Sequence, residues 1–170
     1  MNPGEMKKLK IYLDTSVINF LFANDSPEKQ DITIEFFESR LDSFDVFISE
    51  IVLFEIQKTP DSKKRSMLRE AIIKYRLRPI PIPEEKTEEI DMIAQKYLDA
   101  GVIPQRKRED AMHIAICTAF EFDILLSWNF RHMANIHKHV QINSLNESMG
   151  YLKKLNLLTL LEVMYENDDQ

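Results

Sequence analysis

Short apolar runs of strand-like composition alternate along this chain with longer segments of helical periodicity, and this alternation is the strongest constraint on its fold. Strands are expected at residues 9–13, 46–49, 78–83, 123–128 and 155–158. Between them, apolar residues recur at the three- and four-residue spacing of a helix face. Strands that alternate with helices pair in parallel, because each crossover returns the chain to the same sheet edge. The sequence therefore predicts an α/β fold of three layers, with a central, mostly parallel sheet of about five strands flanked by helices.

Caps and breakers mark the ends of several predicted elements. Pro27 follows Ser26, which is the order expected at the start of a helix. Residues 84–100 carry apolar side chains on one helix face and precede Gly101, a common helix stop. Residues 78–83 contain three prolines, which cannot donate to an interior ladder, so this strand is expected at a sheet edge.

The chain has 170 residues, of which 44% are hydrophobic, enough for one domain with its own core. We expect a polar extension at residues 1–8, the domain at 9–162 and a polar tail at 163–170. The single cysteine, Cys117, lies in an apolar run and is expected to be a core residue in a reducing cytoplasm.

No apolar stretch approaches the roughly 18 residues needed to span a bilayer. The first ten residues are polar and are not followed by a signal-peptide segment. We therefore expect a cytoplasmic protein without membrane association, whose mature chain begins near Met1 or Met6.

The formal net charge of −6 argues against non-specific nucleic-acid binding, which depends on neutralising phosphates. Positive charge is nevertheless concentrated locally. Two basic groups stand next to polar residues that interrupt apolar sequence, and they consist of Arg106, Lys107 and Arg108, and of Arg131, His132, Lys138 and His139. They are placed to provide counter-charge for a substrate that carries phosphate.

Four acidic or amide residues interrupt or border the apolar runs: Asp14, Glu55, Asp110 and Asn129. Burying even a neutral polar group without a partner costs about 2 to 7 kcal/mol, and a carboxylate costs more. In open parallel sheets, ligands bind outside the carboxyl ends of the strands. A divalent cation shared by these side chains at that edge would explain all four intrusions.

Each residue also has an ordinary structural explanation. Asp14 can be a helix N-cap, and a capping role also competes with metal binding at Asp110, in the first turn of a predicted helix. Glu55 can be solvated, although the helix around it is apolar and expected to be buried. Asn129 alone would be a turn residue, and His113 is expected to be an interior histidine that bonds a backbone carbonyl.

Four segments, LDTSVI, ISEIVLFEI, EDAMHIA and LLSWNFRHMAN, resemble in this order the motifs of the PIN domain, the nuclease fold of VapC-type toxins. The resemblance covers residues 9–162 and implies a PIN-like three-layer fold. It implies that Asp14, Glu55 and Asp110 are catalytic acids that bind metal. Asn129 stands where many members have a fourth acid, so the implied metal site carries one charge fewer.

The resemblance further implies an endoribonuclease that depends on Mg²⁺ or Mn²⁺ and is the toxin of a toxin–antitoxin pair. RNA is the expected substrate, an antitoxin protein is a candidate partner, and a homodimer is expected. The residues assigned to substrate binding are Thr15, Ser16, Arg106, Arg108 and Arg131.

Other functions remain open at this stage. A PIN-like module with weak or no catalysis would bind RNA or a protein partner without cutting. A phosphatase of the haloacid dehalogenase type needs a second Asp two positions after Asp14, where this chain has Ser16. A response-regulator receiver would need adjacent acids on the first strand, which residues 9–14 lack.

Overall fold

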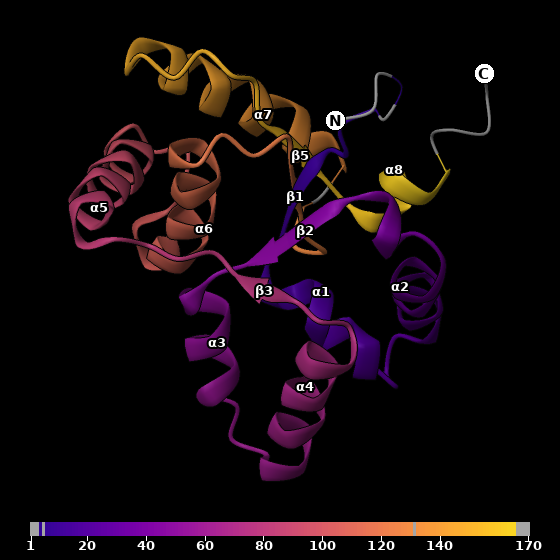
Figure 1. Ribbon diagram of the computed structural model, residues 1–170. Helices are drawn as coiled ribbons and strands as arrows, with labels where there is room; N and C mark the ends of the chain where they lie inside the picture. Colours follow the sequence, from indigo (N-terminus) through magenta and orange to yellow (C-terminus); the bar gives the residue numbers. More distant parts are fainter. Residues whose placement is uncertain (1–3, 5, 131, 166–170) are drawn as a thin grey trace.

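Five parallel strands form the central sheet of the computed structural model, which describes residues 4, 6–130 and 132–165 (Figure 1). Their order is β3-β2-β1-β4-β5, and every pairing is parallel. The strands are β1 (Lys10–Leu13), β2 (Asp45–Ile48), β3 (Arg78–Pro79), β4 (Ile124–Leu126) and β5 (Asn156–Leu158). The predicted α/β architecture with a parallel sheet of about five strands is confirmed.

Helices cover both faces of this sheet. In Figure 1, α5, α6 and α7 lie together on one side, α2 and α8 lie on the other, and α3 and α4 extend beyond the sheet near α1. Their bounds are α1 (Thr15–Asn19), α2 (Pro27–Ser39), α3 (Glu50–Gln57), α4 (Ser62–Lys74), α5 (Glu84–Asp99), α6 (Arg108–Ala119), α7 (His132–Ser148) and α8 (Leu160–Tyr165). None of the described helices is long and apolar enough to cross a membrane.

The central strand β1 is buried on both faces, as expected for a strand between two helix layers. Ile11, Tyr12 and Leu13 are fully buried, and Ile11 pairs with Val46 of β2 and Ile124 of β4. The strand therefore delivers the residue that follows it, Asp14, to the middle of the carboxyl edge of the sheet.

The prolines limit the edge strand, as the sequence indicated. β3 lies at the sheet margin and spans only two residues of the predicted 78–83. Ile80 still donates its backbone N–H to Ile48 O at 2.8 Å, but Pro81 and Pro83 have no N–H to donate. The position of the strand is therefore confirmed, and its length was overestimated.

The ends of three helices can be compared with the sequence-based expectations. Pro27 occupies the first turn of α2, although the Ser26 side chain makes no capping bond. Gly101 follows α5 with a φ of +71°, the left-handed conformation that glycine adopts easily. α8 continues past residue 162 and buries Val163 and Met164.

Candidate active site

A small pocket, here called the site pocket, lies at the carboxyl edge of the sheet and has a volume of about 30 Å³. Its polar lining comes from the ends of β1 and β4, from α6 and its approach, and from α7, and consists of Asp14, Lys107, Asp110, His113, Ser127, Asn129 and Lys138. The structure thus brings Asp14, Asp110 and Asn129 to one pocket. Sequence reasoning had not singled out Ser127, and Lys138 had been noted only as part of a basic group.

Asp14 caps α1 and faces the site pocket at the same time. Its Oδ1 accepts hydrogen bonds from Ser16 N at 3.0 Å and from Ser16 Oγ at 2.5 Å. Burial raises the pKa of the Asp14 carboxyl, although His113 and the hydroxyls of Ser127 and Ser16 oppose the rise. The simple capping explanation is therefore correct, and it leaves room for a second role.

The two hydroxyl residues after Asp14 have different surroundings. Ser16 Oγ donates to Asp14 and accepts from Trp128 N at 2.9 Å, and it lies 3.3 Å from Ser127 Oγ. Ser16 therefore ties the end of β1 to the end of β4. Thr15 Oγ1 is buried and has no hydrogen-bond partner among the described residues.

Asp110 lies in the first turn of α6, where the helix dipole favours a negative charge. Its Oδ2 is 3.8 Å from Lys107 Nζ, a distance typical of a loose, partly exposed ion pair. Asp110 also lines a second, open hollow of about 700 Å³, here called the outer hollow. The site pocket and the outer hollow share Lys107 and Asp110, so they lie next to each other.

Glu55 is placed differently from the other two acids. It projects from α3, and its Oε1 lies 2.6 Å from His113 Nε2. Glu55 does not line the site pocket, but its partner His113 does. In the described part of the chain, no group of three or more His, Cys, Asp or Glu side chains is placed to hold one ion.

The helix that carries Glu55 is less buried than the sequence indicated. Leu53 and Phe54 point to solvent, with Phe54 58% exposed, and only Val52 and Ile56 of α3 are buried. The expectation of a buried helix was therefore wrong. Apolar residues surround Glu55 in sequence, but in space its carboxylate sits at the boundary between core and solvent.

His113 is buried as predicted, but side chains satisfy it where a backbone carbonyl was expected. Its Nδ1 lies 2.6 Å from the Tyr12 hydroxyl, which in turn lies 2.6 Å from Ser49 Oγ. Burial acts to lower the pKa of His113, but the bond to Glu55 and the negative charges of Asp14 and Glu55 raise it overall. Tyr12 precedes Asp14 by two positions, so the period of a strand places both on one face.

Asn129 is exposed at the rim of the site pocket. Its backbone N–H donates to Ser127 Oγ at 3.0 Å, which closes a tight bend after β4. The side-chain amide therefore combines a turn position with access to the pocket.

The oxygen atoms gathered here suit a hard divalent cation. Asp14 and Asp110 offer carboxylates, Asn129 an amide oxygen and Ser127 a hydroxyl. Mg²⁺ commonly binds through one or two carboxylates and keeps several waters, and Mn²⁺ favours the same ligands. The residues present therefore suit one such ion, with Asp14 and Asp110 as its candidate carboxylate ligands.

Two of the three predicted substrate-binding arginines line the outer hollow. Arg106 and Arg108 both line it, together with the exposed ring of Phe54. Arg108 is engaged with α5, because its guanidinium donates to Gln95 Oε1 at 3.0 Å and lies 3.3 Å from Asp91 Oδ1. Arg131 falls outside the described residues.

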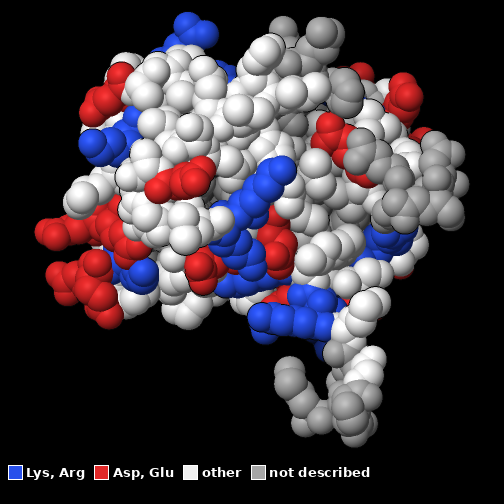
Figure 2. Space-filling model, turned by 90° about the horizontal axis from the view of Figure 1, so that it is seen from above, with Lys and Arg blue, Asp and Glu red and all other residues white. Residues whose placement is uncertain are grey.

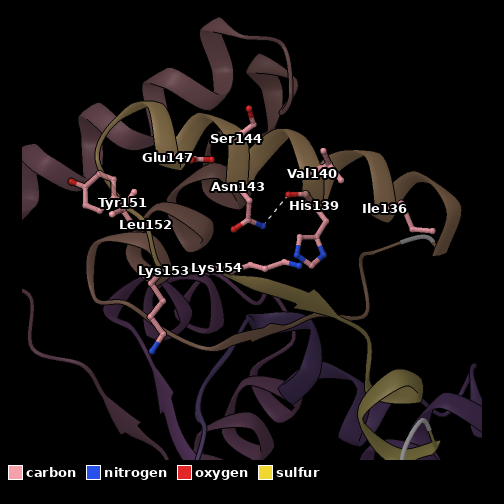
Figure 3. Close-up of a pocket in the computed structure, with 10 residues that line it drawn as sticks. All are labelled: Ile136, His139, Val140, Asn143, Ser144, Glu147, Tyr151, Leu152, Lys153 and Lys154. Carbon is pink, nitrogen blue, oxygen red and sulfur yellow. Dashed lines mark hydrogen bonds between the residues drawn. The ribbon is translucent and has the colours of Figure 1, made fainter.

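Another open hollow, of about 640 Å³, lies between α7 and the segment that leads to β5 (Figure 3). His139 and Asn143 of α7 face Lys154 across it, and Asn143 Nδ2 donates to His139 O at 3.0 Å. No predicted site residue lines this hollow.

Comparisons with known proteins agree with the α/β fold. Residues 11–133 match the family model described as PIN domain. The fold is similar to the crystal structure of VapBC2 from Rickettsia felis bound to a DNA fragment from their promoter, with a TM-score of 0.53 and 13% identity. The match covers 89% of this chain and 98% of the other chain, and at this identity it shows the fold alone. A search of curated proteins finds no match.

Proposed function

The chain belongs to the PIN domain family, whose members are typically nucleases, and on this basis we propose that it is a metal-dependent endoribonuclease that hydrolyses single-stranded RNA. One observation carries this proposal: Asp14 and Asp110, which come from distant parts of the chain, line one pocket at the carboxyl edge of a parallel sheet. No described serine, cysteine or histidine arrangement at this pocket resembles a nucleophilic triad.

A bound Mg²⁺ or Mn²⁺ would supply an activated water and stabilise the departing oxygen of the phosphodiester. In this proposal Asp14 and Asp110 hold the ion, and the side-chain amide oxygen of Asn129 is its third protein ligand. Lys107 and Lys138, which line the same pocket, offset the negative charge of the phosphate. Glu55 is the third acidic residue of the predicted site, and it is connected to the pocket through its hydrogen bond with His113.

The outer hollow is the proposed path of the RNA strand. Arg106, Lys107 and Arg108 supply positive charge along it, and the exposed ring of Phe54 offers a surface on which an unpaired base can stack. Asp91, Glu109 and Asp110 also line this hollow, and on the face seen in Figure 2 Lys and Arg are likewise interspersed with Asp and Glu. Affinity for RNA is therefore expected to come from this local set of side chains, and not from the chain's net charge of −6.

By analogy with VapBC2, the proposal extends to a role as the toxin of a toxin–antitoxin pair. A homodimer in the cytoplasm stays an expectation from the sequence. A small adjacent reading frame whose product co-purifies with this chain and suppresses its ribonuclease activity would support that role. Activity that no neighbouring gene product inhibits would argue for a ribonuclease outside such a pair.

A second candidate function is a PIN-like module that binds RNA or a protein partner without cutting. One observation favours it: the described residues hold only two carboxylates at the site pocket, with Glu55 turned to His113 and Asn129 uncharged. Metal-dependent cleavage separates the two candidates.

The decisive experiment incubates purified protein with end-labelled single-stranded RNA and Mg²⁺ or Mn²⁺. Cleavage is expected, and EDTA, Asp14→Asn or Asp110→Asn should abolish it. Asp61→Asn is the matched control, because Asp61 caps α4 through the same kind of bond and lines neither the site pocket nor the outer hollow. Activity that survives EDTA, or that persists in both site variants, would exclude this chemistry.

A further inference from the structure

We propose that Tyr12 and His113 are positioning residues that hold the Glu55 carboxylate beside the site pocket. This inference rests on the proposed function, because it assigns to Glu55 a place in the same metal centre. The observation behind it is a continuous hydrogen-bonded chain that runs from the core of the protein to Glu55.

This chain links three elements through side chains alone. Ser49, at the N-cap of α3, lies 2.6 Å from the Tyr12 hydroxyl of β1, and Tyr12 lies 2.6 Å from His113 Nδ1 of α6. His113 Nε2 then lies 2.6 Å from Glu55 Oε1. The hydrogen-bonded chain thus begins at the N-cap residue of α3 and ends at Glu55 in the same helix.

The hydrogen bonds of this chain can all point the same way, with each group donating to the next one towards Glu55. Ile51 N–H donates to Ser49 Oγ at 3.2 Å, Ser49 donates to Tyr12, and Tyr12 donates to His113 Nδ1. The remaining ring proton, on His113 Nε2, then points at the Glu55 carboxylate. Each group has one partner on either side, so the orientation of His113 is fixed before any ligand binds.

This hydrogen-bonded chain differs from a second buried polar cluster among the described residues. Tyr97, Thr118 and Asn146 bond one another in a closed triangle, with distances of 2.9, 2.6 and 3.0 Å. All three are buried, and their bonds end within the core. The chain through Tyr12 and His113 instead ends on a carboxylate whose side chain is 23% exposed, at the edge of the site.

Glu55 depends on this chain for its orientation. It lies on a helix whose neighbouring residues Leu53 and Phe54 point to solvent, and among the described residues the side chain of His113 is the only hydrogen-bond partner of its carboxylate. Asp110 and His113 are three positions apart and share one face of α6. The residue that holds Glu55 therefore also lines the pocket with Asp14 and Asp110.

Tyr12→Phe and Tyr97→Phe form a matched pair for the test, since each removes one buried hydroxyl that has two partners. Mn²⁺ affinity is measured by calorimetric titration and melting temperature is measured in EDTA. His113→Leu should weaken Mn²⁺ binding by about 10- to 100-fold, the usual effect of losing a residue that orients a ligand. Tyr12→Phe should weaken it in the same direction, and Tyr97→Phe should lower the melting temperature without changing affinity.

His113→Gln tests rescue, because its amide can still donate to Glu55, and affinity should return towards that of the wild type. Wild-type affinity in both Tyr12→Phe and His113→Leu would overturn the inference, as would an equal loss of affinity in Tyr97→Phe. Should His113→Leu fail to fold, Tyr12→Phe decides alone. If the wild type binds no Mn²⁺, the proposed function fails and this inference fails with it.

Discussion

Replacing Asp14 by Asn separates the two roles that this carboxylate has in the structure. The capping role needs only an oxygen at Oδ1, which Asn retains, and Asn caps helices about as well as Asp. The proposed metal role needs the negative charge, which Asn lacks. The variant should therefore keep the fold and lose the cation.

The expected stability change in EDTA follows from the raised pKa of Asp14. Burial disfavours the ionised form, so the folded-state pKa of this acid lies above its unfolded-state pKa. For a raised acid, the native state binds more protons between the two values, and stability falls as pH rises through that window. Asp14→Asn removes this unfavourable term, so at neutral pH its melting temperature without metal should equal or exceed that of the wild type.

Added metal should reverse the order. At a Mn²⁺ concentration of 100 times Kd, binding to the native state stabilises it by about 2.7 kcal/mol, which corresponds to a rise in Tm of about 5–11 °C for a chain of this size. Asp14→Asn should show little of this rise, whereas Asp61→Asn should show all of it. Scanning calorimetry with EDTA and with Mn²⁺ measures both effects. A variant that is less stable than the wild type in EDTA, or that keeps the full Mn²⁺ shift, would refute the reasoning.

Three further predictions concern the rim of the site pocket, the proposed RNA path along the outer hollow, and the hydrogen bonds of Ser16 that connect the ends of β1 and β4. Asn129→Asp should tighten Mn²⁺ binding by adding one charge, and unchanged affinity and stoichiometry in a calorimetric titration would make Asn129 a turn residue only. Arg106→Ala should weaken RNA binding and lessen its salt dependence more than Arg108→Ala, because Arg108 is paired with α5; equal effects in filter binding at several salt concentrations would contradict this. Ser16→Ala should cost about 1–3 kcal/mol in urea unfolding, since it leaves Trp128 N without its side-chain acceptor, and a loss below about 0.5 kcal/mol would show that this bond matters little.

Local sequence rules were sufficient for the parts of the fold that depend on neighbours in the chain. Proline at the start of α2, glycine after α5 and the proline-limited edge strand all follow from backbone chemistry that operates over a few residues. The meeting of Asp14 with Asp110 was also predictable. Both lie where a parallel sheet gathers strand ends and helix starts, whatever the details of packing.

The placement of Glu55 was not predictable by the same rules. Helical spacing shows that Asp110 and His113 share a face, and strand spacing shows that Tyr12 and Asp14 do. Neither rule states how close α3 comes to α6, which depends on packing between elements far apart in sequence. A similar limit applies to Arg108, whose pairing with Asp91 joins two helices that the sequence leaves unplaced.

The two candidate functions require different roles of the His113–Glu55 contact. If the imidazole holds Glu55 in place for a cation at Asp14 and Asp110, the contact completes a three-acid centre whose third member is kept in position from the core. If the imidazole is instead the permanent partner of Glu55, the pocket retains two carboxylates and a neutral amide, a set that suits a single weakly held ion. The direction of the free Glu55 oxygen therefore distinguishes the two candidate functions. An oxygen directed at the pocket would favour the ribonuclease, and one directed away from it would favour the binding module.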